Sequence, residues 1–512
     1  MTDTRSETQP HLAIDRRTLL GGAAALLVSA TVRAGEPNRL DDDRRLPNPA
    51  SGESRALAAY VANTGYDALP GVVRTMTQRS VLDALGVSMA AAGLEAACQP
   101  FIDTASEVGG NGAARIIGAG GRGAAMPMAA LANGALAHAL DYEDAHDPSR
   151  THPNAATVAA AITIADATGG ISGREFMLAV ALGCDITCRL SMAKGKVDEL
   201  PTAYYPPAIA GTFGAAAAAA RLLKLNPEQT LNAFSLALCQ NSCSAEILFD
   251  PYSDVRAVRD GFCAQAGVQA AMLARHGVKG FQAPFEGKGG FFSMYGDGRY
   301  HAGMLADRLG VRFAGADVGF KAWPACRDNH LYIQAALEGN GRDRLVAGDI
   351  KHIRAFVKER NLIVCEPAAE KREPRAPIDA KFSLYFTVAA AAIHGRINLA
   401  SYTPDALQDT ATLALAQRIE YERDDNHARL ERNGEGLALQ VTLNNGRVID
   451  WVVGPLYGSP SNPMSEKALV EKFVDCAAAA RQPLAPAEAN QLAQTLLNLE
   501  AVSDMRQVTH LL

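Results

Sequence analysis

Alanine- and glycine-rich segments with helical periodicity dominate the chain from about residue 56 to residue 310. Apolar residues recur at i, i+3 and i+4 in 80–93, 176–193 and 211–225, which is the spacing of one helix face. Several of these segments are apolar on nearly all sides, as helices inside a bundle or at a subunit contact are. Because alanine and glycine are small, neighbouring helices can approach closely. The sequence therefore predicts a large, tightly packed helical domain.

A different pattern begins near residue 317. The strand-like segments are 352–359, 418–424 and 438–453, and the helical segments between them are 330–338 and 379–394. The last strand-like segment alternates on both sides of Asn444-Asn445-Gly446, which indicates a β-hairpin. These elements predict a smaller α+β domain.

Helical pattern returns at 465–512, after a segment rich in serine, proline and asparagine. We therefore predict a mainly α protein. Its large all-helical domain is made from both ends of the chain, residues 56–316 and 458–512. A smaller α+β lid domain, residues 317–457, is inserted between them.

Residues 1–34 have the features of an export signal. Arg16-Arg17 precede a short apolar run, and the segment ends in small residues at Ala34, as in a twin-arginine signal. The apolar run is too short to span a bilayer, so no membrane attachment is expected once the signal is removed. We predict a periplasmic protein, or a cytoplasmic one if the signal is not used. The polar residues 35–55 are predicted to form a linker.

The net charge argues against nucleic-acid binding, and the cysteine spacing argues against a zinc site. The net charge is −6 and no dense basic run is present, which argues against nucleic-acid binding. The chain has nine cysteines and no CxxC pair with a nearby histidine, so we expect reduced thiols and no zinc site.

Ionisable residues are concentrated between two apolar helical segments. Residues 138–152 contain His138, His146, His152, Asp141, Glu143, Asp144 and Asp147. Such a cluster is compatible with a metal site, a solvated loop or an acid–base site. The histidine and glutamate spacings of zinc proteases are absent, which argues against a metal site. The flanking helices should be buried, which argues against a solvated loop, so we expect the loop to line a cleft. We favour the acid–base site, because a carboxylate beside a histidine tunes the imidazole for proton transfer.

A glycine-rich motif at 118–123 fits GxGxxG. A dinucleotide site would need this motif inside a βαβ unit, and no alternation of strands and helices follows it. We interpret the motif as a glycine turn.

A second set of polar residues lies where the pattern changes. Lys321, Arg327 and His330 fall within ten residues that straddle Pro324 and open a helix. The alternative interpretation is an ordinary basic surface loop. Because clefts between domains are favoured ligand sites, we predict an anion clamp.

These two sets, in this order, resemble the MmgE/PrpD family of lyases, which includes 2-methylcitrate dehydratase, cis-aconitate decarboxylase and iminodisuccinate epimerase. The matching segments are 129–144, 151–162, 183–193, 204–225, 264–291, 320–330 and 380–397. The resemblance implies a homodimer without metal or organic cofactor, and an active site between the two domains. It assigns the catalytic positions to Asp141, His152 and Lys321, and it matches His330 to a common histidine.

Four positions depart from the family pattern. Histidines found in other members are replaced by Met192, Tyr205 and Cys326, and a histidine–proline pair is replaced by Arg259-Asp260. These replacements argue against decarboxylation of cis-aconitate. The predicted substrate-binding residues are Arg189, Tyr205, Arg259, Cys326, Arg327 and His330.

The sequence thus predicts a cofactor-free lyase, a dehydratase of the 2-methylcitrate type that acts on a di- or tricarboxylate. Its chemistry would require cations around the substrate carboxylate and a positioned base. The alternatives are an epimerase or racemase of an amino- or imino-dicarboxylate, and a carboxylate-binding protein without activity. All three require the Asp141 carboxylate and the Lys321 amine to share one cavity.

Overall fold

The computed structural model describes residues 44–195, 203–250, 253–431 and 433–512. The predicted signal at 1–34 lies outside the described residues, as does the first part of the predicted linker at 35–55. In the described part of that linker, Arg45 pairs with Tyr300 through two backbone hydrogen bonds of 2.7 and 3.0 Å. The first helix begins at Glu53.

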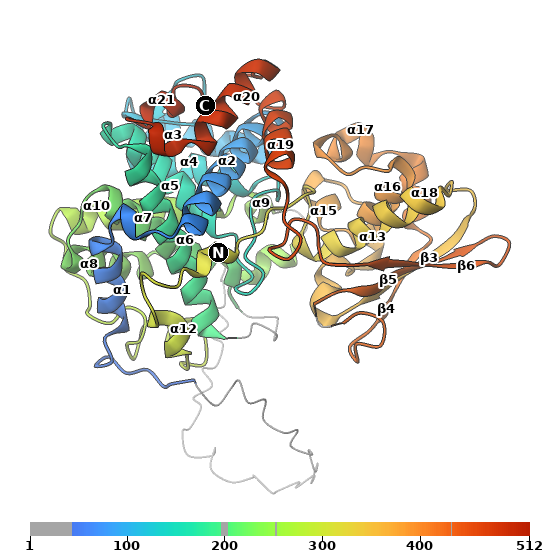
Figure 1. Ribbon diagram of the computed structural model, residues 1–512, viewed down its shortest axis with the longest axis horizontal. Helices are drawn as coiled ribbons and strands as arrows, with labels where there is room; N and C mark the ends of the chain where they lie inside the picture. Colours follow the sequence, from blue (N-terminus) through green and yellow to red (C-terminus); the bar gives the residue numbers. More distant parts are fainter. Residues whose placement is uncertain (1–43, 196–202, 251–252, 432) are drawn as a thin grey trace, which may run out of the picture. The chain divides into compact units, whose positions relative to one another are not determined.

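The helical part is formed by elements from both ends of the chain (Figure 1). Its helices are α1 (Glu53–Asn63), α2 (Gly71–Leu94), α3 (Gln99–Val108), α4 (Met126–His138), α5 (Pro153–Thr168), α6 (Gly173–Lys194), α7 (Pro206–Leu222), α8 (Pro227–Leu238), α9 (Val255–Val258), α10 (Asp260–Arg275), α11 (Phe291–Met294), α12 (Ala302–Ala306), α19 (Glu466–Ala478), α20 (Pro486–Leu497) and α21 (Arg506–Thr509). Helices α19 and α20 pack on α2, which confirms the prediction that the two chain ends share one helical core.

Small residues bring the central helices close together. Helix α10 packs against α4, α7 and α8. A Cβ atom at Gly134 of α4 would lie 2.6 Å from the carbonyl oxygen of Asp260, and one at Gly261 of α10 would lie 2.5 Å from that of Leu131. Only glycine fits this contact, and it fixes the end of α4 beside the start of α10.

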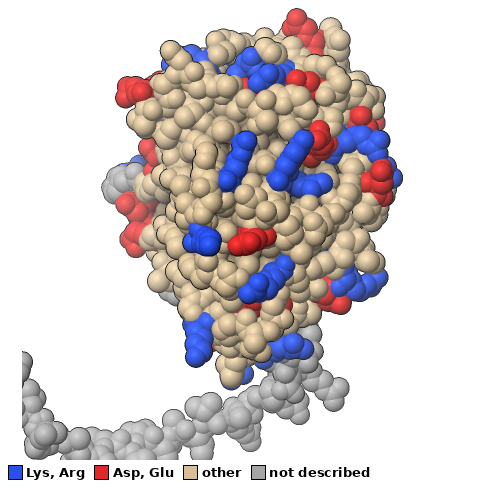
Figure 2. Space-filling model, turned by 90° about the vertical axis from the view of Figure 1, so that its left-hand side faces the viewer, with Lys and Arg blue, Asp and Glu red and all other residues tan. Residues whose placement is uncertain are grey.

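Helix α6 is long and apolar enough to cross a bilayer, but most of it is buried within the bundle. Its apolarity is therefore that of a core helix. On the surface, the face shown in Figure 2 carries scattered Lys and Arg side chains with uncharged surface between them.

The glycine motif lies in a small two-stranded ribbon. Strands β1 (Ala114–Arg115) and β2 (Gly123–Ala124) pair antiparallel. Between them Gly118, Gly120 and Gly121 all have positive φ angles, which glycine adopts readily. The segment is a glycine turn, as the sequence indicated.

The α+β part contains a four-stranded sheet and helices that lie on one side of it (Figure 1). Its elements are α13 (Arg327–Asp343), β3 (Ile350–Val357), α14 (Ala368–Arg372), α15 (Pro377–Lys381), α16 (Leu384–His394), α17 (Pro404–Leu407), α18 (Thr410–Ala416), β4 (Ile419–Arg423), β5 (Gly436–Leu443) and β6 (Val448–Val453). The strand order is β4-β3-β5-β6. Strands β3 and β4 are parallel, and the other two pairs are antiparallel.

A second apolar core separates this sheet from its helices. Helix α13 passes close over β6, because a Cβ atom at Gly339 would lie 2.3 Å from the Trp451 ring. The chain enters this part through residues 318–326 and leaves it through 454–465. The predicted strands and hairpin are present, and the fold is mainly α with a small α+β part, as predicted.

Candidate active site

The loop between α4 and α5 carries the ionisable cluster. Helix α4 ends at His138, and His152 is the residue that precedes the first turn of α5. Asp141 has a φ angle of 50°, which is the left-handed conformation that residues with a Cβ atom rarely adopt. Its backbone N–H donates a 2.7 Å hydrogen bond to the carbonyl of His138. The loop therefore turns sharply back and directs its side chains inward.

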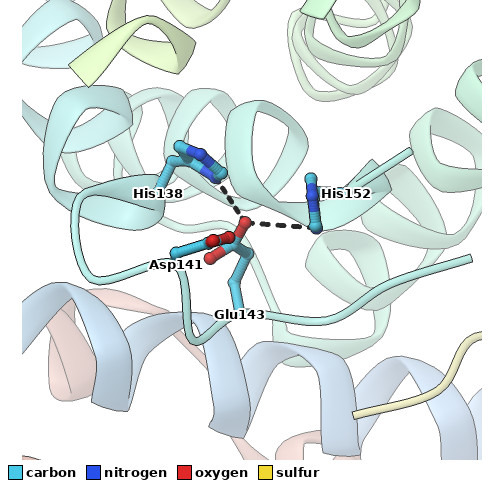
Figure 3. A group of neighbouring side chains, drawn as sticks. All are labelled: His138, Asp141, Glu143 and His152. Atoms are coloured by element: carbon cyan, nitrogen blue, oxygen red, sulfur yellow. Dashed lines mark hydrogen bonds and ion pairs between the residues drawn. The ribbon is translucent and has the colours of Figure 1, made fainter. Parts of the chain in front are cut away.

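Glu143 is the centre of this cluster (Figure 3). Its Oε1 atom is bonded to Nδ1 of His138 and lies 3.2 Å from Nδ1 of His152. The same oxygen is 3.7 Å from Nζ of Lys321. The Glu143 side chain is fully buried, so its charge is stabilised by these three groups rather than by water.

The Asp141 carboxylate and the Lys321 ammonium form a buried ion pair. The two residues are 180 positions apart in the sequence. Their segments are joined by reciprocal backbone hydrogen bonds between Ala145 and Gly319, of 2.9 and 2.8 Å. The structure thus brings together the two groups on which the sequence interpretation depended.

The cluster contains two carboxylates and one ammonium group at neutral pH. Burial raises the pKa of a carboxyl group, but Lys321 outweighs that effect and holds the pKa of Asp141 at about 2. Although burial opposes them, His138 and Lys321 hold the pKa of Glu143 well below its usual range. Burial would lower the pKa of Lys321, yet Asp141 and Glu143 keep it above its usual value.

His152 is a neutral imidazole with one free ring nitrogen. Burial and the nearby Lys321 lower the pKa of His152 to about 3. Its Nδ1 atom lies 2.8 Å from the backbone oxygen of Asp144, and because a carbonyl oxygen only accepts, Nδ1 carries the proton. Nε2 is therefore unprotonated, as a general base requires.

A cavity of about 800 Å³ opens beside this cluster. Of the residues that the sequence singled out, it is lined by Asp141, His152, Tyr205, Arg259, Cys326 and Arg327. Its walls come from the α4–α5 loop, the beginning of α7 and the α+β part, including residues 453–456 after β6. Lys321 is fully buried behind Asp141, so it acts on the cavity through that carboxylate.

Arg189 and His330 are not lining residues of this cavity. The Arg189 guanidinium is 2.7 Å from Asp185 and donates to the carbonyl of Asp307 at 3.0 Å. Its contacts therefore hold α6 to the segment after α12, instead of the substrate contact predicted for it.

His330 is buried under the junction turn. Its Nε2 atom is 3.2 Å from the carbonyl oxygen of Ala325, and its ring packs against Trp323 at a centroid distance of 5.3 Å. Burial and Arg327 hold the pKa of His330 well below its usual range. This neutral ring stabilises the turn at Pro324, and the structure gives it no path to the cavity.

The other predicted binding residues form one wall. Arg327 donates two hydrogen bonds, of 3.0 and 2.8 Å, to the Asp147 carboxylate. The guanidinium of Arg259 lies 4.8 Å from the centre of the Tyr205 ring. Burial raises the pKa of the Cys326 thiol, so that side chain is neutral. Arg259 is also paired, since its Nε lies 3.6 Å from Asp260, so both arginines have a carboxylate partner.

Arg256, in α9, does not line the cavity itself but packs on a residue that does, and sequence reasoning did not single it out. It is buried, and its guanidinium lies 3.4 Å from the centre of the Phe382 ring, itself part of the cavity wall. Its Nε and Nη2 atoms have no hydrogen-bond partner among the described residues. A buried guanidinium with unpartnered N–H groups is suited to binding an anion. The signal for it was its i, i+3 spacing from Arg259.

The cluster also has the composition of a metal site. Ligand atoms of His138, Asp141, Glu143 and His152 lie within 4.8 Å of one another. However, the Lys321 ammonium contacts Asp141 and is near Glu143, so a divalent cation would be repelled by it. The sequence prediction of a metal-free site stays a prediction.

Comparison with known families identifies the family of this chain. The MmgE/PrpD N-terminal domain matches residues 55–302, and the MmgE/PrpD C-terminal domain matches residues 323–499. The chain belongs to the MmgE/PrpD family. This confirms the resemblance inferred from the sequence, and the first matched domain contains the α4–α5 loop with its buried cluster.

Three similar proteins are cis-aconitate decarboxylases. The one from Homo sapiens is 26% identical over 390 residues, which cover 75% of this chain and 79% of that protein. The one from Mus musculus is 24% identical, with 86% and 89% covered. The one from Aspergillus terreus is 22% identical over 489 residues, or 91% and 96% of the two chains. This MmgE/PrpD chain is thus similar to those enzymes along most of its length.

Proposed function

We propose that this protein is a cofactor-free lyase acting on a tricarboxylate or a related dicarboxylate, and that its reaction is a dehydration of the 2-methylcitrate type. The observation that carries the proposal is the buried Asp141–Lys321 pair beside neutral His152 at one wall of the cavity. Membership of the MmgE/PrpD family and the similar decarboxylases support a lyase.

Dehydration begins at a carbon next to a carboxylate, whose proton is very weakly acidic. Negative charge develops on that carboxylate in the transition state, so cations aimed at it lower the barrier. We assign this role to Arg259, which lines the cavity, and to the buried Arg256, which packs on Phe382 of the cavity wall. Nε2 of His152, or the unpartnered Oδ2 of Asp141, takes the proton. The C–H electron pair forms the double bond as the C–O bond breaks, and the proton taken by the base passes to the departing hydroxyl, so that water leaves and the base is regenerated.

Decarboxylation of cis-aconitate is the second candidate, because the similar proteins carry that name. It needs a proton donor for the carbanion that remains after CO₂ departs. At neutral pH both Asp141 and His152 are unprotonated on the atoms that could reach the cavity. Dehydration supplies this proton itself, because the proton that the base takes from carbon can pass to the departing hydroxyl, whereas decarboxylation supplies none. Tyr205 and Cys326, where other members have histidine, support the same preference.

The test is a panel of substrates followed by proton NMR in D₂O with the purified protein. Turnover of 2-methylcitrate or citrate to an unsaturated acid supports dehydration. Loss of CO₂ from cis-aconitate would replace it with the decarboxylase. Deuterium exchange without loss of water would indicate an epimerase or racemase. Calorimetric binding of a tricarboxylate without turnover or exchange would indicate a binding protein.

We also propose that the protein works outside the cytoplasm, on the basis of Arg16-Arg17 and the apolar run that follows. Replacing both arginines by lysine should keep the chain in the cytoplasmic fraction of a host with a twin-arginine exporter. Equal fractionation of the two forms would contradict export.

A further inference from the structure

Lys472 of α19 is a buried lysine that lies outside the cavity and has three polar partners. Its Nζ atom is 2.6 Å from the carboxylate of Asp83 in α2. It donates to the backbone oxygen of Tyr142 at 2.7 Å and to that of Lys321 at 2.9 Å. It also lies 3.8 Å from the centre of the Tyr142 ring. Two N–H groups of the ammonium ion are therefore hydrogen-bonded to backbone carbonyls, and the Asp83 carboxylate balances its charge as an ion pair.

The two carbonyl groups belong to the segments that carry the catalytic pair. Tyr142 follows Asp141 directly, and the other carbonyl is that of Lys321 itself. Further along, the two segments are joined by the backbone pairing of Ala145 with Gly319. Lys472 thus holds the segments together at the end where their side chains form the ion pair.

Lys472 places a buried charge at a position where an uncharged side chain could have filled the same volume. Burying an ammonium ion costs several kcal/mol unless it is paired and hydrogen-bonded. Asp83 supplies the counter-charge, and burial raises the pKa of Asp83 while Lys472 opposes that rise. An ion pair whose cation gives both of its hydrogen bonds to the segments of Asp141 and Lys321 is more specific than general core packing requires.

We propose that Lys472 is a positioning residue: its ammonium group fixes the distance between the Asp141 and Lys321 segments, so that the carboxylate and the amine meet at the cavity wall. Its kinetic consequence rests on the proposed function, because turnover must first be found. The geometry itself does not depend on which substrate is used.

The main test is the double variant Asp83→Asn/Lys472→Met. It removes both charges, so no unpaired charge is left buried and the protein is expected to fold. With the substrate that the wild type turns over, kcat should fall about 100-fold, as expected when reacting groups are displaced by about 1 Å. KM should change much less, because the cationic wall is untouched. The control is Lys467→Met on the exposed side of the same helix, which should keep the wild-type kcat.

A purely structural pair would lower the melting temperature and leave kcat per folded molecule unchanged, and that result would overturn the proposal. The single variant Asp83→Asn keeps both carbonyl contacts, so it should lower kcat less than the double variant does. Equal losses in the two would also overturn it.

A crystal structure of the double variant separates this inference from the proposed function. Asp141 and Lys321 should move beyond the ion-pair limit of about 4 Å. If the wild type turns over no tricarboxylate, the proposed function fails, and this distance alone decides the role of Lys472. An unchanged ion pair in the variant would overturn the inference.

Discussion

At Asp141 the left-handed backbone conformation favours glycine, whereas the ion pair with Lys321 requires a carboxylate side chain. A left-handed conformation costs a residue with a Cβ atom of order 1–3 kcal/mol, and glycine would avoid that cost. The chain nevertheless has aspartate there, with φ 50° and its carboxylate bound to Lys321. Strain of this kind persists where the surroundings over-determine the conformation. The carboxylate side chain, rather than the backbone conformation, therefore accounts for aspartate at position 141. This agrees with the proposed role of Asp141 in proton transfer.

Asp141→Asn should reduce kcat by about 10³-fold, within the range lost when a positioned acid or base is removed. The amide keeps the shape of the side chain but cannot accept a proton from carbon. Substrate turnover and thermal unfolding are measured together, with surface Asp425→Asn as the control. A near-normal rate would show that Asp141 has only a structural role.

Asp144 should make stability depend on pH. Burial raises the pKa of Asp144 to about 8, although Asn154 donates a hydrogen bond to it; the unfolded value is about 3.9. The folded state thus keeps a proton that the unfolded chain releases. Its contribution to stability is complete below about pH 4 and is lost as the pH rises through about 8. Melting temperatures from pH 5 to pH 9 should fall less steeply in Asp144→Asn. Parallel curves would contradict the assignment.

Chelation tests whether the four-residue cluster holds a metal. Because the Lys321 ammonium already contacts Asp141 and approaches Glu143, turnover should be unchanged after prolonged dialysis against EDTA. Metal analysis of the same samples provides the control. Activity that is lost with EDTA and restored by one divalent ion would show that the cation is part of the site.

At the scale of elements, local patterns were sufficient to locate most of the fold. Strand alternation at 352–359 and 418–424 located β3 (Ile350–Val357) and β4 (Ile419–Arg423) to within two residues, because side-chain alternation is a property of the strand itself. The order β4-β3-β5-β6 and the register depend on contacts between distant segments, and no local pattern encodes them.

In the candidate site, too, local sequence patterns located some residues, whereas contacts between distant segments could not be predicted. Asp141 and Lys321 were found through polar residues in apolar surroundings. Arg189 was assigned to the substrate, whereas its partner Asp185 lies four residues earlier on α6, a spacing that already predicts an ion pair within the helix. Lys472 could not have been found this way, because its partners are backbone carbonyls on two distant segments.

Arg256 of helix α9 should contribute to substrate binding more than to the rate of the chemical step. Arg256→Gln removes a buried guanidinium with unpartnered Nε and Nη2 atoms. A hydrogen bond to a charged group contributes about 1.5–3 kcal/mol, so KM should rise by about 10- to 100-fold while kcat changes less. Arg275→Gln, at the exposed end of α10, is the control and should keep the wild-type KM. An unchanged KM in Arg256→Gln would show that the substrate carboxylate binds elsewhere.

At the scale of the whole molecule, the catalytic centre depends on three regions far apart in sequence. The α4–α5 loop supplies the carboxylates and His152, the entry to the α+β part supplies Lys321, and α19 near the C-terminal end supplies Lys472. An insertion between two halves of a helical core meets this need, since both crossings of the chain pass beside the site. Loosening either crossing should therefore affect the chemistry before it affects the two cores.

The surface predicts the mode of assembly. The face shown in Figure 2 carries scattered Lys and Arg side chains with uncharged surface between them. The segment 249–281, which includes α9 and α10, exposes large apolar side chains at Phe249, Val255, Phe262, Leu273, Val278 and Phe281. A second copy of the chain could cover these exposed apolar side chains by two-fold symmetry.

We therefore expect a homodimer that uses this α10 face. Light scattering after size-exclusion chromatography should give twice the chain mass for the wild type. Phe262→Glu with Leu273→Glu should give a monomer, because two buried charges per subunit would be left without partners. Val448→Glu in β6, where an equally exposed apolar side chain is changed, should stay dimeric. A monomeric wild type would contradict the dimer, and a dimeric double variant would move the interface to another face. Arg259, directly before α10, also lines the cavity. A dimer formed through this helix would therefore stabilise the position of Arg259, and the monomeric variant should bind substrate more weakly.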